Sequence, residues 1–135
     1  MSVGKDARVV EEALYTGLSA AKGLLCAISA IDQEKAQYWL KKLQIDHLKK
    51  HRVNEISGGE LRKLMIARAM AQDPDLLLLD EYTANLDTAS RDSIVQSLQQ
   101  IQQEQDITCV IAAHDLESIP KNCDKILRLI PPSPL

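Results

Sequence analysis

Residues 75–81 read Asp-Leu-Leu-Leu-Leu-Asp-Glu, a short apolar run that ends in two acids. Such a run, bounded by Pro74 and by the acids, predicts a β-strand that is covered on both faces. Two adjacent carboxylates at the end of a buried strand are costly unless they serve a purpose. Asp80 could hold Mg²⁺ through water, and Glu81 could accept a proton from an attacking water molecule. A functional pair is therefore the preferred interpretation, and an acidic turn that caps the next segment is the alternative.

The residues after this strand predict a parallel strand–helix–strand unit. Asp87 is placed to cap a helix, and residues 107–112 form a second apolar run, typical of a buried strand. A crossover of this length joins parallel strands with a right-handed connection. A short helix is expected at 115–119 and a third strand at 125–130. The crossover helix has four apolar residues on one face: Ile94, Val95, Leu98 and Ile101.

His114 follows the second predicted strand, in the stretch Ala112-Ala113-His114-Asp115. Ligands of parallel sheets gather at the carboxyl ends of the strands. We therefore expect His114 to lie beside Asp80 and Glu81. A hydrogen-bonded structural histidine is the alternative interpretation.

Upstream of the leucine run, residues 56–60 read Ile-Ser-Gly-Gly-Glu and open a helix expected from Ser57 to about Gln72. Gly58 and Gly59 let the backbone approach an anion, and the Ser57 hydroxyl adds a donor to the free N–H groups of the helix start. A simple serine cap with a flexible entry is the alternative. Apolar residues nearly encircle this helix, which predicts that it is well buried.

The first half of the chain is predicted to be mostly helical. Residues 9–30 carry apolar side chains at helical spacing, with Gly17 and Gly23 as points that could divide the segment. Asp32 is a plausible N-cap for a helix that runs through Leu43. The polar and basic residues 44–55 predict a solvated connector.

Length and composition exclude several classes of protein. The chain has 135 residues, 45% of them hydrophobic, and a net charge of −3, with no Phe. This balance gives no reason to expect a nucleic-acid or acidic-membrane patch. No apolar run approaches the roughly 20 residues that span a bilayer, and the polar first ten residues do not suggest a signal peptide. Three cysteines without metal-ligand spacing indicate reduced thiols: Cys26, Cys109 and Cys123.

Taken together and in this order, the motifs resemble those of the ATP-binding cassette (ABC) ATPases. Residues 56–60 resemble the signature motif, and residues 61–70 resemble the helix that follows it. Residues 75–81 resemble Walker B with its catalytic glutamate, residues 84–87 (Ala-Asn-Leu-Asp) resemble the D-loop, and His114 resembles the switch histidine. The resemblance extends over residues 56–130, and residues 9–18 are weakly similar to the start of the family's helical subdomain.

The resemblance implies an α/β fold of the P-loop NTPase-like ABC ATPase type. It implies a helical subdomain portion at 1–55, an α/β portion at 56–130 with a partial parallel β-sheet and flanking helices, and a Pro-rich tail at 131–135. Asp80 would join the Mg²⁺ shell through water, Glu81 would be the general base, and His114 would contact the γ-phosphate. The residues that would face the ATP of a partner subunit or the dimer interface are Ser57, Gly58, Gly59, Glu60 and Asp87.

The same resemblance implies partners and a location. ATP hydrolysis would be coupled to transmembrane transport through a membrane permease subunit and a second cassette chain, which could be another copy of this chain. Nucleic acid is not expected as a partner. The chain would be cytoplasmic and peripheral at the inner face of the membrane.

The sequence departs from the family pattern at several positions. Tyr82 stands where the family usually has Pro, Ala84 where Ser is common, and Lys63 where Arg is common, while Glu60 replaces a frequent Gln. The Walker A pattern G-x-x-x-x-G-K-[ST] is absent from the 135 residues. Because that loop supplies the main triphosphate contacts, we expect this chain alone to bind ATP poorly and to hydrolyse almost none. ATP and Mg²⁺ are expected only in a completed site.

Other interpretations remain open. The chain could be a non-enzymatic half-module that completes an ATP site held by a partner, or a truncated gene product. It could also be the C-terminal lobe of a DNA-repair or SMC-like ATPase, or a translation-factor cassette. The absence of a heptad arm and the acidic charge disfavour the former, and the absence of a histidine in residues 83–87 disfavours the latter.

Overall fold

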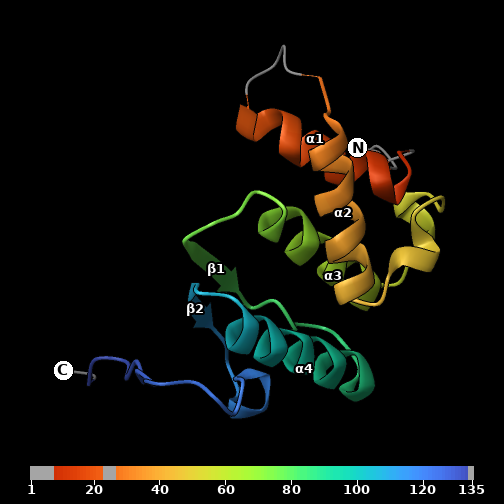
Figure 1. The fold of residues 1–135 in the computed structure, drawn as a ribbon. Helices are drawn as coiled ribbons and strands as arrows, with labels where there is room; N and C mark the ends of the chain where they lie inside the picture. Colours follow the sequence, from red (N-terminus) through yellow and green to blue (C-terminus); the bar gives the residue numbers. More distant parts are fainter. Residues whose placement is uncertain (1–7, 23–26, 134–135) are drawn as a thin grey trace.

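The computed structural model describes residues 8–22 and 27–133 (Figure 1). Helices alternate with two strands in the second half of the chain. The elements are α1 (Val10–Lys22), α2 (Ala30–Lys42), α3 (Gly58–Met70), β1 (Leu76–Asp80), α4 (Thr88–Glu104) and β2 (Thr108–Ala112), with the 3₁₀ helices η1 (Asp46–Leu48), η2 (Val53–Glu55) and η3 (Leu116–Ser118).

Helices α1, α2 and α3 pack together and share one mainly aliphatic core, which also contains Trp39 and Tyr82, with α4 and β1. Gly17 lies inside α1 and does not divide it, contrary to the expectation. A Cβ at Gly17 would lie 2.5 Å from Cγ of Arg68 on α3, so glycine is what lets the Arg68 side chain lie against α1. The expected division at Gly23 falls outside the described residues.

Helix α2 begins at a different cap from the one expected. Ser29 is the N-cap, and its hydroxyl oxygen accepts from the backbone N–H of Asp32 at 3.2 Å. The Asp32 carboxylate accepts in return from the Ser29 backbone N–H at 2.9 Å. Asp32 is thus the third helical residue of a capping box rather than the cap itself.

The connector between α2 and α3 is more ordered than a solvated loop. It contains η1 and η2, and it buries Ile45 and Leu48 in the core. Its backbone also bonds to the start of α1, where the N–H of Val10 donates to the carbonyl of His51 at 3.0 Å. The basic side chains His51 and Arg52 are exposed, as the sequence predicts.

Helix α3 begins after Ser57, as expected, but it is buried on one side only. Leu64, Ala67 and Met70 lie in the core, whereas Leu61 and Met65 are exposed. The apolar residues encircle the helix, but the described residues supply neighbours for only part of its surface.

Strands β1 and β2 are parallel, with Leu76 opposite Thr108 and Asp80 opposite Ala112. Helix α4 forms the crossover between them (Figure 1), and this confirms the predicted strand–helix–strand unit. The expectation that β1 is covered on both faces is wrong. Leu77 is buried, but Leu78 is 67% exposed, and Val110 on β2 is exposed as well. Helices cover one face of the sheet, and no described element covers the other.

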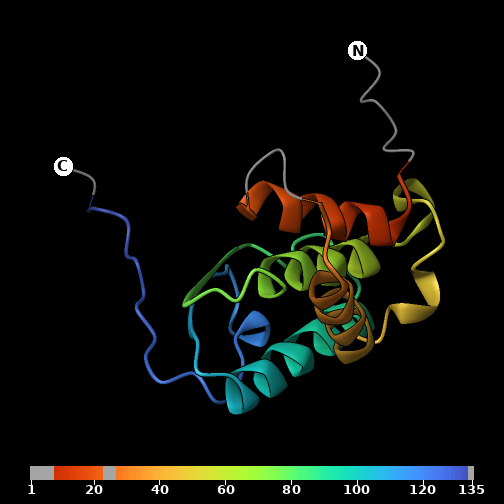
Figure 2. The ribbon, with the colours of Figure 1, turned by 45° about the horizontal axis from the view of Figure 1, so that its top comes forward.

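The third strand expected at residues 125–130 does not form. The sheet of the described residues has two strands, and residues 121–133 are exposed, with Leu129 at 94%. Figure 2 shows this segment extending away from the helices. A strand needs a neighbour that accepts and donates its ladder hydrogen bonds, and residues 125–130 meet none among the described residues.

Two further observations complete the fold. Within the described ranges, no helix combines the length and the apolar character needed to cross a membrane. The division at residues 55 and 130 stays a prediction, since α3 packs both on α1 and α2 and on α4.

Candidate functional site

The carboxyl ends of β1 and β2 bring three sequence-predicted site residues to one place. The backbone N–H of Glu81 donates to the carbonyl of Ala112 at 2.8 Å, which extends the strand pairing by one residue. Nε2 of His114 then lies 2.6 Å from Oε1 of Glu81. Their side chains are 81% and 46% exposed, so a ligand at the strand ends can reach both. The expected proximity of His114 to Glu81 is confirmed.

Glu81 has an unusual backbone conformation. Its φ is 48°, in the left-handed region that residues with a Cβ rarely adopt. The chain turns there at once, and the N–H of Ala84 donates to the carbonyl of Glu81 at 3.0 Å. Such conformations cost free energy and cluster at functional sites. The turn places the Glu81 carboxylate directly past the end of β1.

Asp80 is the last residue of β1 and is exposed. Its carboxylate has no hydrogen-bond or ion-pair partner among the residues that the structure describes. Within that same part of the chain, no group of three His, Cys, Asp or Glu side chains could hold a metal by itself. Mg²⁺ commonly binds one or two carboxylates and completes its shell with substrate phosphates and water. The donor set fits that mode of binding and not an all-protein metal cage.

Ser57 and Glu60 form a capping box at the start of α3. The N–H of Glu60 donates to the Ser57 hydroxyl at 3.1 Å, and the N–H of Ser57 donates to a carboxylate oxygen of Glu60 at 2.8 Å. The hydrogen bond from the Ser57 backbone is the main cause that lowers the pKa of Glu60. The serine is therefore an N-cap, as the alternative interpretation states, and it remains exposed.

The two glycines that follow Ser57 lie close to the turn before α4 and to the first turn of α4. A Cβ at Gly59 would lie 3.0 Å from Cβ of Ser90, and a Cβ at Gly58 would lie 3.3 Å from Leu86 Cδ2. Glycine therefore allows the first turns of α3 and α4 to approach each other more closely than residues with a side chain would.

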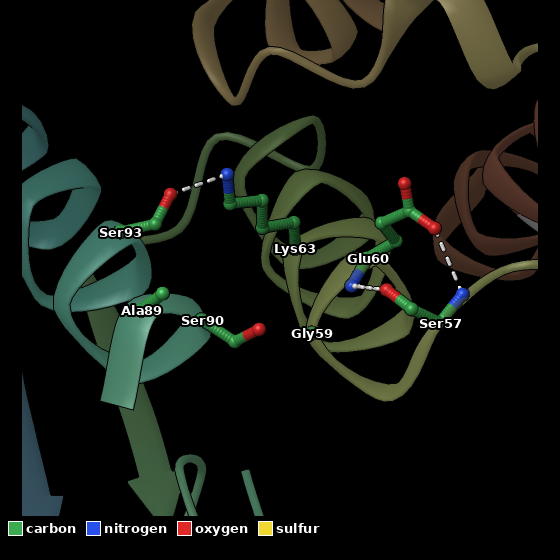
Figure 3. A pocket seen from close by; sticks show the side chains of 7 residues that line it. All are labelled: Ser57, Gly59, Glu60, Lys63, Ala89, Ser90 and Ser93. Atoms are coloured by element: carbon green, nitrogen blue, oxygen red, sulfur yellow. Dashed lines mark hydrogen bonds between the residues drawn. The ribbon is translucent and has the colours of Figure 1, made fainter. Parts of the chain in front are cut away.

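A pocket of about 310 Å³ lies between these two helix starts. Figure 3 shows the Lys63 side chain reaching across it, where Nζ donates to the Ser93 hydroxyl at 2.7 Å. Burial lowers the pKa of Lys63, because desolvation disfavours the ammonium. Residues Ser57, Gly59, Glu60, Lys63, Ala89, Ser90 and Ser93 line the pocket.

Asp87 caps α4, as predicted. Its carboxylate accepts from the Ser90 hydroxyl at 2.6 Å and from the Ser90 backbone N–H at 3.1 Å. These hydrogen bonds lower the pKa of Asp87. Ser90 thus contacts both Asp87 and the Gly59 backbone region, and it joins the predicted D-loop to the predicted signature motif.

The candidate site therefore has two parts. Asp80, Glu81 and His114 lie at the strand ends, while the residues at 57–60 and Asp87 lie at the helix starts. The turn at residues 81–87 connects them. The sequence interpretation missed Ser90 and Ser93 as pocket residues. Ser90 and Ser93 are three residues apart, as are the N-cap Ser57, Glu60 and Lys63 at the start of α3. Because residues three apart share a helix face, this spacing was the signal that could have found them.

The sequence interpretation also missed a buried polar cluster beside the strand ends. Tyr82 Oη donates to the carbonyl of Ser118 at 2.6 Å. The hydroxyl groups of Thr83 and Ser118 share a second hydrogen bond of 2.6 Å. All three residues are buried. No local pattern could have revealed these contacts, which join residues 35 and 36 positions apart.

Comparisons with known proteins agree with this geometry. The sequence model of a family described as "ABC transporter" matches residues 2–84. The chain is 36% identical over 110 residues to the "Probable metal transport system ATP-binding protein" of Thermotoga maritima, a match that covers 82% of this chain and 46% of the relative. It is 41% identical over 91 residues to the lipoprotein-releasing system ATP-binding protein LolD of Francisella tularensis, covering 67% of this chain and 39% of the relative.

The fold has close counterparts among solved structures. One ABC transporter in an inward-facing conformation superposes with a TM-score of 0.77 at 31% identity, covering 83% of this chain and 45% of that one. The chain thus spans less than half the length of each of these three proteins.

Proposed function

The chain belongs to the ABC transporter family of ATP-binding proteins, and on that premise we propose that it supplies the signature and hydrolytic parts of an ATPase that drives transport. The observation that carries the proposal is the Glu81–His114 pair at the ends of two parallel strands. A second part of the site, the serine–glycine–glycine helix start at residues 57–59, follows from the sequence and is joined to the pair by the turn at residues 81–87. We assign no transported substrate, because the relatives are named for different ones: metal, zinc and lipoproteins.

We assign the strand-end residues to hydrolysis. Glu81 polarises or deprotonates the attacking water, a role that needs an exposed carboxylate past the strand end. His114 lies within hydrogen-bond distance of that carboxylate and contacts the γ-phosphate. Asp80 joins the shell of Mg²⁺, which neutralises phosphate charge when bound.

The helix starts are assigned to nucleotide recognition. Ser57 presents a hydroxyl, and Gly58 and Gly59 present backbone N–H groups at the helix start, which suit an anion such as the γ-phosphate of an ATP held by a partner cassette. Glu60 keeps Ser57 in place through the capping box. Asp87 lies at the interface with that cassette, and a membrane permease completes the assembly at the cytoplasmic side of the membrane.

The first arm of the test measures this chain alone. The sequence contains no G-x-x-x-x-G-K-[ST] loop. Calorimetric titration with MgATP should give a Kd of about 1 mM or weaker, near −4 kcal/mol, and phosphate release should stay at background. Turnover by the chain alone that disappears in Glu81→Gln would refute this expectation.

The second arm restores the missing loop. The N-terminal part of the Thermotoga maritima relative is fused ahead of this chain, and ATP hydrolysis by the chimera is measured. Glu81→Gln should lower kcat by about 100-fold or more, while Glu104→Gln, which changes an exposed glutamate at the end of α4, should leave it unchanged. Equal rates in the two variants would contradict the role of Glu81.

A further inference from the structure

Tyr82 and Thr83 directly follow Glu81, yet their side chains are buried rather than exposed at the strand ends. Tyr82 is 4% exposed, and its hydroxyl donates to the Ser118 carbonyl at 2.6 Å. Thr83 bonds to the Ser118 hydroxyl at the same distance. Ser118 is therefore held through both its backbone and its side chain by the turn that carries Glu81.

Ser118 is in turn connected to the segment that carries His114. Its backbone N–H donates to Asp115 Oδ1 at 2.8 Å, and Asp115 is the residue next to His114. The N–H of Ile119 donates to the carbonyl of Leu116 at 3.2 Å and closes η3. At the other end, Ala112 accepts from the N–H of Glu81. Residues 113–117 are thus attached at both ends to the chain around Glu81.

These two attachments matter because His114 has little else to hold it. Its side chain is 81% exposed, and the partner that the structure gives it within the described residues is Glu81. Packing therefore cannot fix the imidazole, and its position depends on the short segment that bears it.

We propose that Tyr82 and Thr83 are positioning residues, which hold Ser118 so that His114 stays within hydrogen-bond distance of Glu81. The catalytic meaning of this arrangement rests on the proposed function, but the arrangement itself does not. Burial and the nearby Asp115 raise the pKa of Tyr82, so its hydroxyl remains protonated and continues to donate.

The test uses the full chain and two variants that remove one hydrogen bond each, Tyr82→Phe and Thr83→Val. The first readout is the imidazole ¹⁵N–¹H spectrum of His114, with Glu81→Gln as the reference for a lost Glu81 contact. Both variants should move the His114 signals toward those of Glu81→Gln. Thr83→Ser keeps a hydroxyl and should retain the wild-type signals.

The second readout is hydrogen exchange at the amides of Ser118 and Ile119. Loss of one buried hydrogen bond should speed their exchange by about tenfold, while amides in α4 change less. Tyr38→Phe is the matched control, because Tyr38 is exposed and packs edge-on against Trp39. Wild-type His114 signals in both variants would overturn the proposal, as would equal acceleration of all amides.

The ATPase chimera separates this proposal from the proposed function. There, Tyr82→Phe should lower kcat several-fold and leave KM for ATP unchanged. A chimera that hydrolyses no ATP at all would contradict the proposed function, while the His114 spectra would still decide the role of Tyr82 and Thr83. If Tyr82→Phe instead raised the KM for ATP by the same factor as it lowered kcat, the result would contradict a positioning role for Tyr82.

Discussion

Single carboxylates in this chain contribute to stability by capping helices. The pKa values of Glu60, Asp87 and Asp115 all lie below their ordinary values, each mainly because of hydrogen bonds from a serine. A carboxyl whose pKa is lowered by folding stabilises the folded state above its unfolded pKa and loses that contribution as pH falls through its folded pKa. Acid should therefore weaken the starts of α3, α4 and η3.

Asp87→Asn provides the test at this scale. Asparagine also caps a helix, but it carries no charge to titrate. The urea midpoint of Asp87→Asn should lie below that of the wild type at pH 6, and the difference should shrink as pH falls below the ordinary aspartate value of 3.8. A difference that stays constant between pH 6 and pH 3 would contradict this account.

The residues of the strand-end site were predictable because they follow from the strands. Adjacent parallel strands end at the same edge of a sheet, so Glu81 and His114 had to lie near each other once both strands were recognised. The same reasoning could not find Ser118, because its partners Tyr82 and Thr83 meet it only through the folded turn.

For β1, the prediction of a strand was correct, but the prediction that both of its faces are buried was wrong. Its leucines favour a strand, and a strand forms. Continuous apolar runs are typical of strands with helices on both faces, whereas here only the face with Leu77 is buried. Composition predicts the element, but the neighbours decide which of its faces is covered.

This difference predicts unequal effects of two matched substitutions. Leu77→Ala should lower the free energy of unfolding by about 2–4 kcal/mol, because it leaves a cavity in the core. Leu78→Ala removes the same atoms from an exposed position and should cost less than about 1 kcal/mol. Urea denaturation of both variants measures the two costs. Equal losses would mean that both faces of β1 are covered in solution.

The N-cap residues of the helices could also be predicted only in part from the sequence. Asp87 was predicted as a cap and a serine cap at Ser57 was the alternative interpretation, but Asp32 was taken for a cap when it is the third residue of the capping box of Ser29. Serine and aspartate three residues apart both suit the position, so the sequence alone could not choose between them. Backbone conformation decides, since only the cap residue is extended.

For the whole molecule, the open face of the sheet is the main consequence of the architecture. Leu76, Leu78 and Val110 are exposed there, and the segment at 126–130 adds further exposed apolar side chains. Exposed apolar surface and unpaired strand edges favour association with other chains. We expect dimers or aggregates of this chain as its concentration rises.

Light scattering at tens of micromolar tests this expectation. The double variant Leu78→Lys/Val110→Lys should reduce association, since charges on a sheet oppose pairing. Ile31→Lys, at an exposed position on α2, is the matched control and should have little effect. A wild-type chain that is monomeric at these concentrations would contradict the prediction.

The sequence by itself determined the order of the motifs, the helix starts at Ser57 and Asp87, and the parallel pairing of two strands. These depend on local periodicity, on capping residues and on the length of a crossover, and each of these can be recognised within a short segment of the sequence. Only the tertiary structure decided which strand face is buried, that residues 125–130 form no strand, and that Tyr82 holds Ser118. Those outcomes depend on which distant segments become neighbours, because burial and hydrogen bonding belong to pairs of residues and not to either residue alone.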